Sequence, residues 1–206
     1  MSYYRQSPQA FSVSYLNKLQ RRIQDCPYFA VNNLNRDFVN TKGFSVVFRR
    51  SHLSTVAEHF PYFGRYLEQA LQPDCNAFYL NPLLLKAGSR VDPHIDRSLR
   101  SYCKTIDPPA MVSVLYVSVP EDLEGGELVL RSRQRQVGQI RPQANLLLWF
   151  QGDLTHSVTA VTKGGNRLSL VCEQYSLEDH ELEDIPEFKL ESRAIAPEAK
   201  RTKSRA

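Results

Sequence analysis

The stretch Val91-Asp92-Pro93-His94-Ile95-Asp96 carries an imidazole and a carboxylate two residues apart. Successive side chains of a β-strand point to opposite faces, so His94 and Asp96 are expected to project from the same side of a strand. Such a pair supplies two of the three ligands in the site type that holds non-haem iron(II) with two histidines and one carboxylate. Asp92 shares this face by the same alternation, so either Asp92 or Asp96 could provide the carboxylate. The stretch therefore predicts most of a metal site and requires a second histidine.

The second histidine is expected to be His156, because Arg167-Leu168-Ser169 follows it at a short distance in the chain. On a strand, Arg167 and Ser169 share one face. A guanidinium offers two parallel hydrogen bonds and a positive charge to a carboxylate, and a nearby hydroxyl can add a third hydrogen bond. Taken singly, His94 could satisfy a local hydrogen bond and Arg167 could pair with a surface glutamate. Taken together, these residues favour a metal site with a carboxylate clamp.

The pattern of apolar residues changes from helical to β after Pro73. Leu16, Leu19 and Ile23 recur at helical spacing, and the part from residue 10 to residue 72 is expected to be largely helical, with a short strand at Phe44–Phe48. Eight short segments with strand character follow, separated by turn residues: Ala77–Leu85, the stretch with His94, Met111–Val119, Glu127–Leu130, Arg135–Ile140, Asn145–Phe150, His156–Val161 and Arg167–Tyr175. They indicate a mainly β fold with N-terminal helices, and a jelly roll (a cupin-like double-stranded β-helix) fits best.

The 206 residues suit one domain with a substantial core, because 42% are apolar and 23% are charged. We expect a single domain over residues 1–190, with a helical part at 10–72 and the β-helix core at 77–176. Residues 191–206 are expected to form a basic, flexible tail. The segment Arg97–Pro109 is long and polar, and loops of that length often act as lids.

Composition also bears on the cellular compartment and on the classes of binding partner. The four cysteines are scattered, no apolar run is long enough to span a membrane, and the N-terminal residues lack the apolar core of a secretory signal. These features predict a cytoplasmic protein with no membrane association. Nucleic-acid binding is not expected, because basic and aromatic residues are not interleaved as they are in base-stacking surfaces. Basic residues near the motif form either a solvated face or a mouth for acidic substrates: Arg90, Arg97, Arg100, Lys104, Arg131, Arg133 and Arg135.

From about Ala77 to Tyr175 the sequence resembles the iron- and 2-oxoglutarate-dependent dioxygenases, specifically the prolyl 4-hydroxylase-like branch. The residues that carry the resemblance are Gly88, Pro93-His94-Ile95-Asp96, Gly125-Gly126-Glu127-Leu128, His156 and Arg167-Leu168-Ser169. The resemblance implies that His94, Asp96 and His156 are iron ligands, and it favours Asp96 over Asp92 because the family's acid follows the histidine by two residues. It also implies that Arg167, with Ser169, binds the distal carboxylate of 2-oxoglutarate.

The implied reaction hydroxylates an aliphatic C–H of a peptide, amino acid or small metabolite, consumes O2, and releases succinate and CO2, with ascorbate as a supporting reductant. The branch usually has pocket tyrosines where this chain has Leu85 and Val91. The missing hydroxyl is therefore expected from Tyr79, with Asn81 and Tyr116 as further candidates. The alternative is a non-catalytic jelly-roll module with a metal-binding or sensing role.

Overall fold

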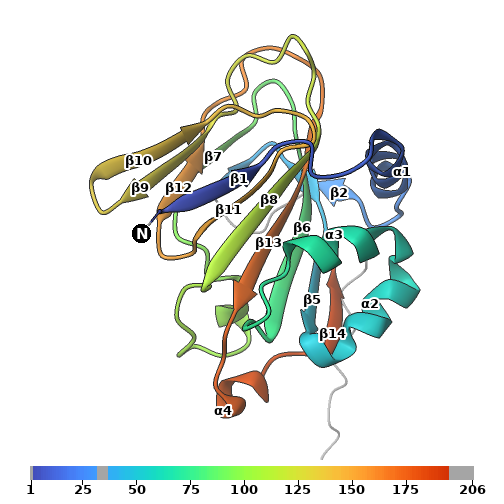
Figure 1. The fold of residues 1–206 in the computed structure, drawn as a ribbon, viewed down its shortest axis with the longest axis vertical. Coiled ribbons are helices and arrows are strands. Elements are labelled where there is room, and N and C mark those ends of the chain that lie inside the picture. The colour runs from blue at the N-terminus through green and yellow to red at the C-terminus, as the bar shows by residue number, and fades with distance from the viewer. Residues whose placement is uncertain (1, 32–36, 195–206) are drawn as a thin grey trace, which may run out of the picture.

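Two antiparallel sheets lie against each other in the computed structural model, which describes residues 2–31 and 37–194 (Figure 1). Across the larger sheet the strand order is β1 (Tyr4–Ser7), β11 (Leu147–Gln151), β8 (Met111–Ser118), β13 (Arg167–Tyr175), β6 (Ala77–Leu85), β4 (Lys42–Gly43) and β2 (Ala30–Val31). Beside this path, β5 (Ser45–Arg49) pairs with β6 and with β14 (Phe188–Glu191). The order across the smaller sheet is β10 (Arg135–Ile140), β9 (Leu128–Ser132), β12 (Thr155–Val158), β7 (Arg90–His94) and β3 (Phe38–Val39).

Helices cover the outer face of the larger sheet (Figure 1). They are α1 (Val13–Gln24), α2 (Leu53–His59) and α3 (Gly64–Ala70), and the short α4 (Asp179–Leu182) lies beyond the end of β13. Ser12 caps the N-terminus of α1: its hydroxyl accepts a hydrogen bond from the backbone N–H of Tyr15 at 3.3 Å. The buried residues Leu19 and Ile23 of α1 belong to the same core cluster as Leu168 and Leu170 of β13.

The opposite face of β13 points toward the smaller sheet. Leu168 and Leu170 belong to the outer core, so alternation turns Arg167, Ser169 and Glu173 inward. Between the two sheets, apolar side chains of β8 and β11 pack against those of β9 and β10. The inner face of β13 therefore places polar residues from a central strand inside the layered fold.

The predicted fold class is confirmed, with strands Ala77–Leu85, Arg135–Ile140 and Arg167–Tyr175 as expected. The short strand expected at Phe44–Phe48 corresponds to β5, but β2, β3 and β4 also lie in the part expected to be helical, and β1 at the N-terminus was not expected. β1 pairs with β11, and β14 pairs with β5, so both are defined by neighbours distant in the chain. Of the predicted basic tail, residues 195–206 lie outside the part of the chain that the structure describes. Its expected first residue, Glu191, is the last residue of β14. Within the described part of the chain, no helix combines the length and the apolar character needed to cross a membrane.

Candidate active site

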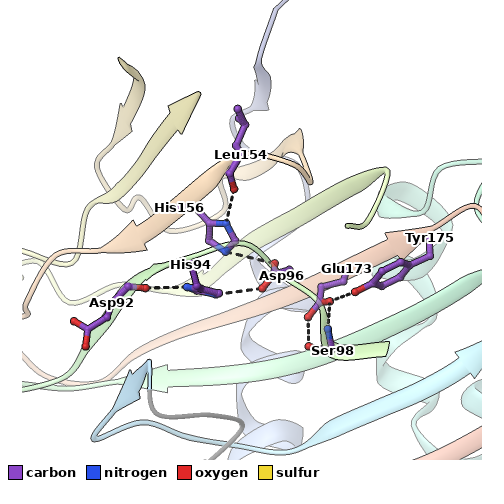
Figure 2. A network of polar contacts seen from close by, with 8 residues as sticks. All are labelled: Asp92, His94, Asp96, Ser98, Leu154, His156, Glu173 and Tyr175. Carbon is purple, nitrogen blue, oxygen red and sulfur yellow. Dashed lines mark hydrogen bonds and ion pairs between the residues drawn. The ribbon is translucent and has the colours of Figure 1, made fainter. Parts of the chain in front are cut away.

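His94 and His156 face each other from neighbouring strands of the smaller sheet. They are paired in the register of β7 and β12, and their ring centroids lie 4.3 Å apart. Asp96 approaches both rings: its Oδ1 lies 3.2 Å from His94 Nε2, and its Oδ2 lies 3.4 Å from His156 Nε2 (Figure 2). One potential ligand atom from each residue lies within 4.8 Å of the other two. The structure thus brings the three predicted metal-binding residues together.

Backbone carbonyls orient both imidazoles. His94 Nδ1 lies 2.8 Å from the carbonyl oxygen of Asp92, and His156 Nδ1 lies 3.2 Å from that of Leu154 (Figure 2). A carbonyl can only accept a hydrogen bond, so each Nδ1 is assigned a proton, and Nε2 is the nitrogen of each ring that faces Asp96 and could bind a metal. Metal-binding histidines are typically held in this way through the nitrogen that does not bind the metal.

The choice between Asp92 and Asp96 is decided by the end of a strand. β7 ends at His94, so Asp96 does not reach the site by strand alternation, as the sequence suggested, but lies in the irregular segment that follows. The Asp92 carboxylate is instead engaged by Arg90, whose Nε lies 2.8 Å from Oδ1, at the protein surface. Only Asp96 is buried beside the two imidazoles.

The three side chains fit a bound metal cation. Asp96 is 6% exposed, and its Oδ2 has no hydrogen-bond partner. Although burial acts to raise the pKa of Asp96, the neighbouring His156 and His94 hold it well below its usual range. Two imidazole nitrogens and a buried carboxylate oxygen form a donor set suited to non-haem iron(II). A bound cation would satisfy the unpartnered oxygen.

A small cavity of about 50 Å³ extends from this cluster to Arg167. The Arg167 side chain is 2% exposed, its guanidinium lies over the ring of Tyr116 at 5.2 Å, and its Nε has no partner. The Ser169 hydroxyl, on the same face of β13, is also buried without a partner. Burial lowers the pKa of Arg167 from its ordinary value, and no carboxylate of the described residues forms an ion pair with it. A buried cation of this kind calls for an anionic ligand.

Gly126 holds the Arg167 side chain in place. Its carbonyl oxygen accepts a hydrogen bond from Arg167 Nη1 at 2.5 Å. The residue has a positive φ of 75°, and a Cβ at this position would lie 3.3 Å from Arg167 Nη1 and 3.3 Å from Val161 Cγ2. Both the conformation and the close approach favour glycine at this position.

A second cavity, of about 520 Å³, is also lined by His94 and Asp96. Glu173 lines it and is 4% exposed. The Glu173 carboxylate accepts hydrogen bonds from the backbone N–H and the hydroxyl of Ser98 and from the hydroxyl of Tyr175 (Figure 2). Burial and the nearby Asp96 raise the pKa of Glu173 to about 8. Sequence reasoning missed Glu173, although it occupies the third alternate position after Arg167 and could have been found by extending that alternation.

The structure does not bring Tyr79 to the predicted cosubstrate clamp. Tyr79 pairs with Glu173 in the register of β6 and β13, whereas Arg167 pairs with Leu85 at the other end of both strands. Tyr79 and Asn81 therefore line the larger cavity, and Tyr116 lines the small one. Of the three candidates for the missing hydroxyl, Tyr116 is the one that lies with Arg167.

Most of the basic residues noted near the motif line neither of the two cavities. Among the seven noted in the sequence, only Arg97 lines the larger cavity, and it is exposed. Arg100 donates a hydrogen bond to the carbonyl of Ile106. The segment Arg97–Pro109 is anchored by the buried Leu99 and Ile106 and contains a 3-10 helix at Ser98–Ser101. This part of the cavity wall is packed on the core.

Residues 79–172 match the family model of the 2OG-Fe(II) oxygenase superfamily. This segment is a 2OG-Fe(II) oxygenase domain. It contains all of the residues that carried the sequence resemblance, which is thereby confirmed. The family implies iron(II) and 2-oxoglutarate as cofactor and cosubstrate. A search of curated proteins finds no significant match to this chain.

Solved structures share the fold of this chain. A Pseudomonas putida prolyl-4-hydroxylase is 15% identical, with a TM-score of 0.56 over 86% of this chain and 94% of that one. A viral collagen prolyl hydroxylase from Paramecium bursaria Chlorella virus-1, in complex with 2OG, is also 15% identical, with a TM-score of 0.51 over 83% and 94%. A Trichoplax adhaerens prolyl hydroxylase, in complex with a hypoxia inducible factor peptide, is 14% identical, with a TM-score of 0.55 over 88% and 86%. At these identities the likeness supports the double-stranded β-helix fold.

Proposed function

We propose that this oxygenase hydroxylates an aliphatic C–H of a peptide, amino acid or small metabolite, with 2-oxoglutarate as cosubstrate and His94, Asp96 and His156 as iron ligands. The observation that carries the proposal is the small cavity with these three side chains at one end and the buried, uncompensated Arg167 at the other. A dicarboxylate would place one carboxylate at Arg167 and direct its other end toward the metal-binding residues. Arg167 and Ser169 supply the charge and the hydrogen-bond donors for the distal carboxylate.

The chain's own residues bind and orient the reactants. The backbone carbonyls of Asp92 and Leu154 hold the two imidazoles with Nε2 toward the site. When bound, iron(II) would supply the oxygen activation that converts 2-oxoglutarate and O2 to succinate and CO2 and delivers the second oxygen atom to the substrate. Apolar side chains, among them Phe150 and Val158, line the small cavity and limit the access of water to it. The larger cavity, which His94 and Asp96 also line, is where a substrate C–H would approach.

Succinate formation tests this proposal. The full chain is incubated aerobically with Fe(II), 2-oxoglutarate and ascorbate, and succinate is measured by mass spectrometry. We expect slow release even without the true substrate, and its loss in His94→Ala and in Arg167→Ala. Arg131→Ala, at an exposed position on β9, is the matched control and should keep the wild-type rate.

Two outcomes would contradict the proposal. Succinate release that persists in both His94→Ala and Arg167→Ala would show that the reaction does not take place at this site. Metal that stays bound to the wild-type protein without any succinate release would instead support a non-catalytic metal-binding module. The buried Arg167 argues against that alternative, because a purely structural metal site has no need of a second, unpaired cation nearby.

A further inference from the structure

The inner face of β13 carries opposite charges at its two ends. Arg167, Ser169, Val171 and Glu173 alternate along this face, and about 20 Å of strand separates the first from the last at roughly 3.3 Å per residue. Val171 lines both cavities, Arg167 lines the small one, and Glu173 lines the large one. The boundary between the cavities therefore lies between a cationic end and an acidic end of the same strand.

Glu173 is a buried acid without a cationic partner. Its carboxylate receives three hydrogen bonds, from the Ser98 N–H at 3.2 Å, the Ser98 hydroxyl and the Tyr175 hydroxyl. Among residues 2–31 and 37–194, no lysine, arginine or histidine forms an ion pair with it. A carboxylate has about four acceptor positions, so one remains for a ligand. An isolated buried charge is costly, and a cation from the ligand would compensate it.

A second unpartnered acceptor lies on the adjacent strand. Asn81 is 4% exposed and lines the same cavity, and its Oδ1 has no hydrogen-bond partner. Its Nδ2 makes one long contact, of 3.5 Å, with Ser45 Oγ. In the register of β6 and β13, Asn81 is opposite Val171 and so lies diagonally from Glu173. The deep wall thus offers one carboxylate oxygen and one amide oxygen to a group with several N–H donors.

The charged residues of this cavity are arranged by depth. Asp96 and Glu173 are buried and the acids Asp37 and Glu191 are half-buried, whereas the two arginines of the lining, Arg97 and Arg193, are exposed. An acidic substrate group would therefore meet its cations only at the rim, and a basic group would meet acceptors in the interior. The burial of Glu173 and Asn81 favours the second arrangement.

We propose that the larger cavity binds the basic end of an aliphatic chain, a guanidinium or ammonium group as in arginine or lysine, with Glu173 as its anionic partner and Asn81 as a second acceptor. This inference rests on the proposed function, because it assumes that the substrate approaches the metal-binding residues from this cavity. A basic group at Glu173 places the aliphatic carbons of the same chain between Glu173 and the His94–Asp96 side of the cavity. The residue carrying the basic group can be a free amino acid or part of a peptide, and the experiment below distinguishes the two.

The test compares near-isosteric pairs that differ in charge. The full-length protein is loaded with Mn(II) and the inert cosubstrate analogue N-oxalylglycine, so that binding is measured without turnover by isothermal titration calorimetry. The probes are L-arginine against L-citrulline and L-lysine against L-norleucine, and the same four side chains in N-acetylated amides to represent a peptide. We expect at least one basic probe to bind at least tenfold more tightly than its neutral counterpart. Preference for the free or the capped set identifies the source of the chain.

Variants separate recognition from structural support. Glu173→Gln should abolish the preference for the basic probe while its Mn(II) affinity stays within about twofold of wild type. Tyr175→Phe removes one hydrogen bond to Glu173 but keeps the carboxylate, and it should retain the preference. Circular dichroism and thermal melting establish that both variants are folded.

Several results would overturn the inference: equal binding of basic and neutral probes, binding of none of them, or an undiminished preference in Glu173→Gln. A loss of Mn(II) affinity in Glu173→Gln would assign Glu173 to positioning Ser98 and Asp96, and would also overturn it. Succinate release with Fe(II) is measured on the same preparations. If release persists while the charge preference is absent, this inference fails and the proposed function stands.

Discussion

His94 and His156 lie directly opposite each other in the register of β7 and β12, although sixty-one residues separate them in the chain. Pairing in a sheet holds the two side chains on one face, close enough for the Asp96 carboxylate to contact both. Rigid strands are better supports for ligands than loops, so two of the three proposed iron ligands are held before any metal binds.

The identity of the acidic ligand can be tested with two neighbouring aspartates. Asp96→Asn should weaken Mn(II) or Fe(II) binding by about 100-fold or more, since it removes the buried carboxylate from the cluster. Asp92→Asn, which alters an exposed acid paired with Arg90, should leave metal affinity unchanged. Anaerobic titration of the metal-free protein measures both. Weaker binding in Asp92→Asn alone would contradict the assignment.

Arg167 should control the affinity for 2-oxoglutarate without controlling the affinity for metal. Arg167→Lys keeps the charge but loses the planar pair of donors, and we expect a cost of about 2–3 kcal/mol, or roughly 30- to 160-fold in cosubstrate affinity. Titration of 2-oxoglutarate into the Mn(II)-loaded protein measures this cost, with Arg131→Lys on the exposed face of β9 as the control. Unchanged 2-oxoglutarate affinity in Arg167→Lys would remove this residue from the cosubstrate site.

Gly126 should support both folding and cosubstrate binding. In Gly126→Ala, the added methyl group meets the Arg167 guanidinium and Val161 at a position with positive φ, so we expect a loss of about 1–2 kcal/mol in stability and weaker 2-oxoglutarate binding. Gly64→Ala is the matched control, because a Cβ at Gly64 in α3 has no atom within 4 Å. Alanine also has the higher helix propensity, so Gly64→Ala should be neutral or slightly stabilising. Chemical denaturation measures both changes, and equal effects would contradict the role assigned to Gly126.

In the protein without metal or a basic ligand, where no cation stabilises its carboxylate, Glu173 should make the stability depend on pH. The pKa of Glu173 is about 8 in the folded protein and 4.5 for an ordinary glutamate, as in the unfolded chain. Between these two pH values the folded protein keeps the Glu173 carboxyl protonated, whereas the unfolded chain has lost that proton. The resulting stabilisation is present below about pH 4.5 and is lost as the pH rises toward and through 8. Glu173→Gln lacks this dependence, so its melting temperature should fall less than that of wild type between pH 6 and pH 9. Parallel curves for the two proteins would show that Glu173 titrates normally.

Much of the fold was predictable because the pattern of the core strands is local. Arg167–Tyr175 alternates between apolar residues and a polar or mixed set, and both its bounds and the shared face of Arg167 and Ser169 followed from that period. By contrast, β1 is a short polar segment whose strand conformation depends on its pairing with β11, and no local pattern marks it. Strands of this kind become visible only once their partners are placed.

The residue types at the candidate site were determined by the sequence, and their grouping was decided by the tertiary structure. His94 and His156, with Arg167 and Ser169, could be chosen in advance because chemistry restricts metal and carboxylate binding to few side chains. The end of β7 selects Asp96 over Asp92, and the antiparallel register of β6 with β13 separates Tyr79 from Arg167. Alternation along one strand tells which face a side chain takes, but only sheet pairing tells what lies across from it, because hydrogen bonds between strands join residues that are far apart in the chain.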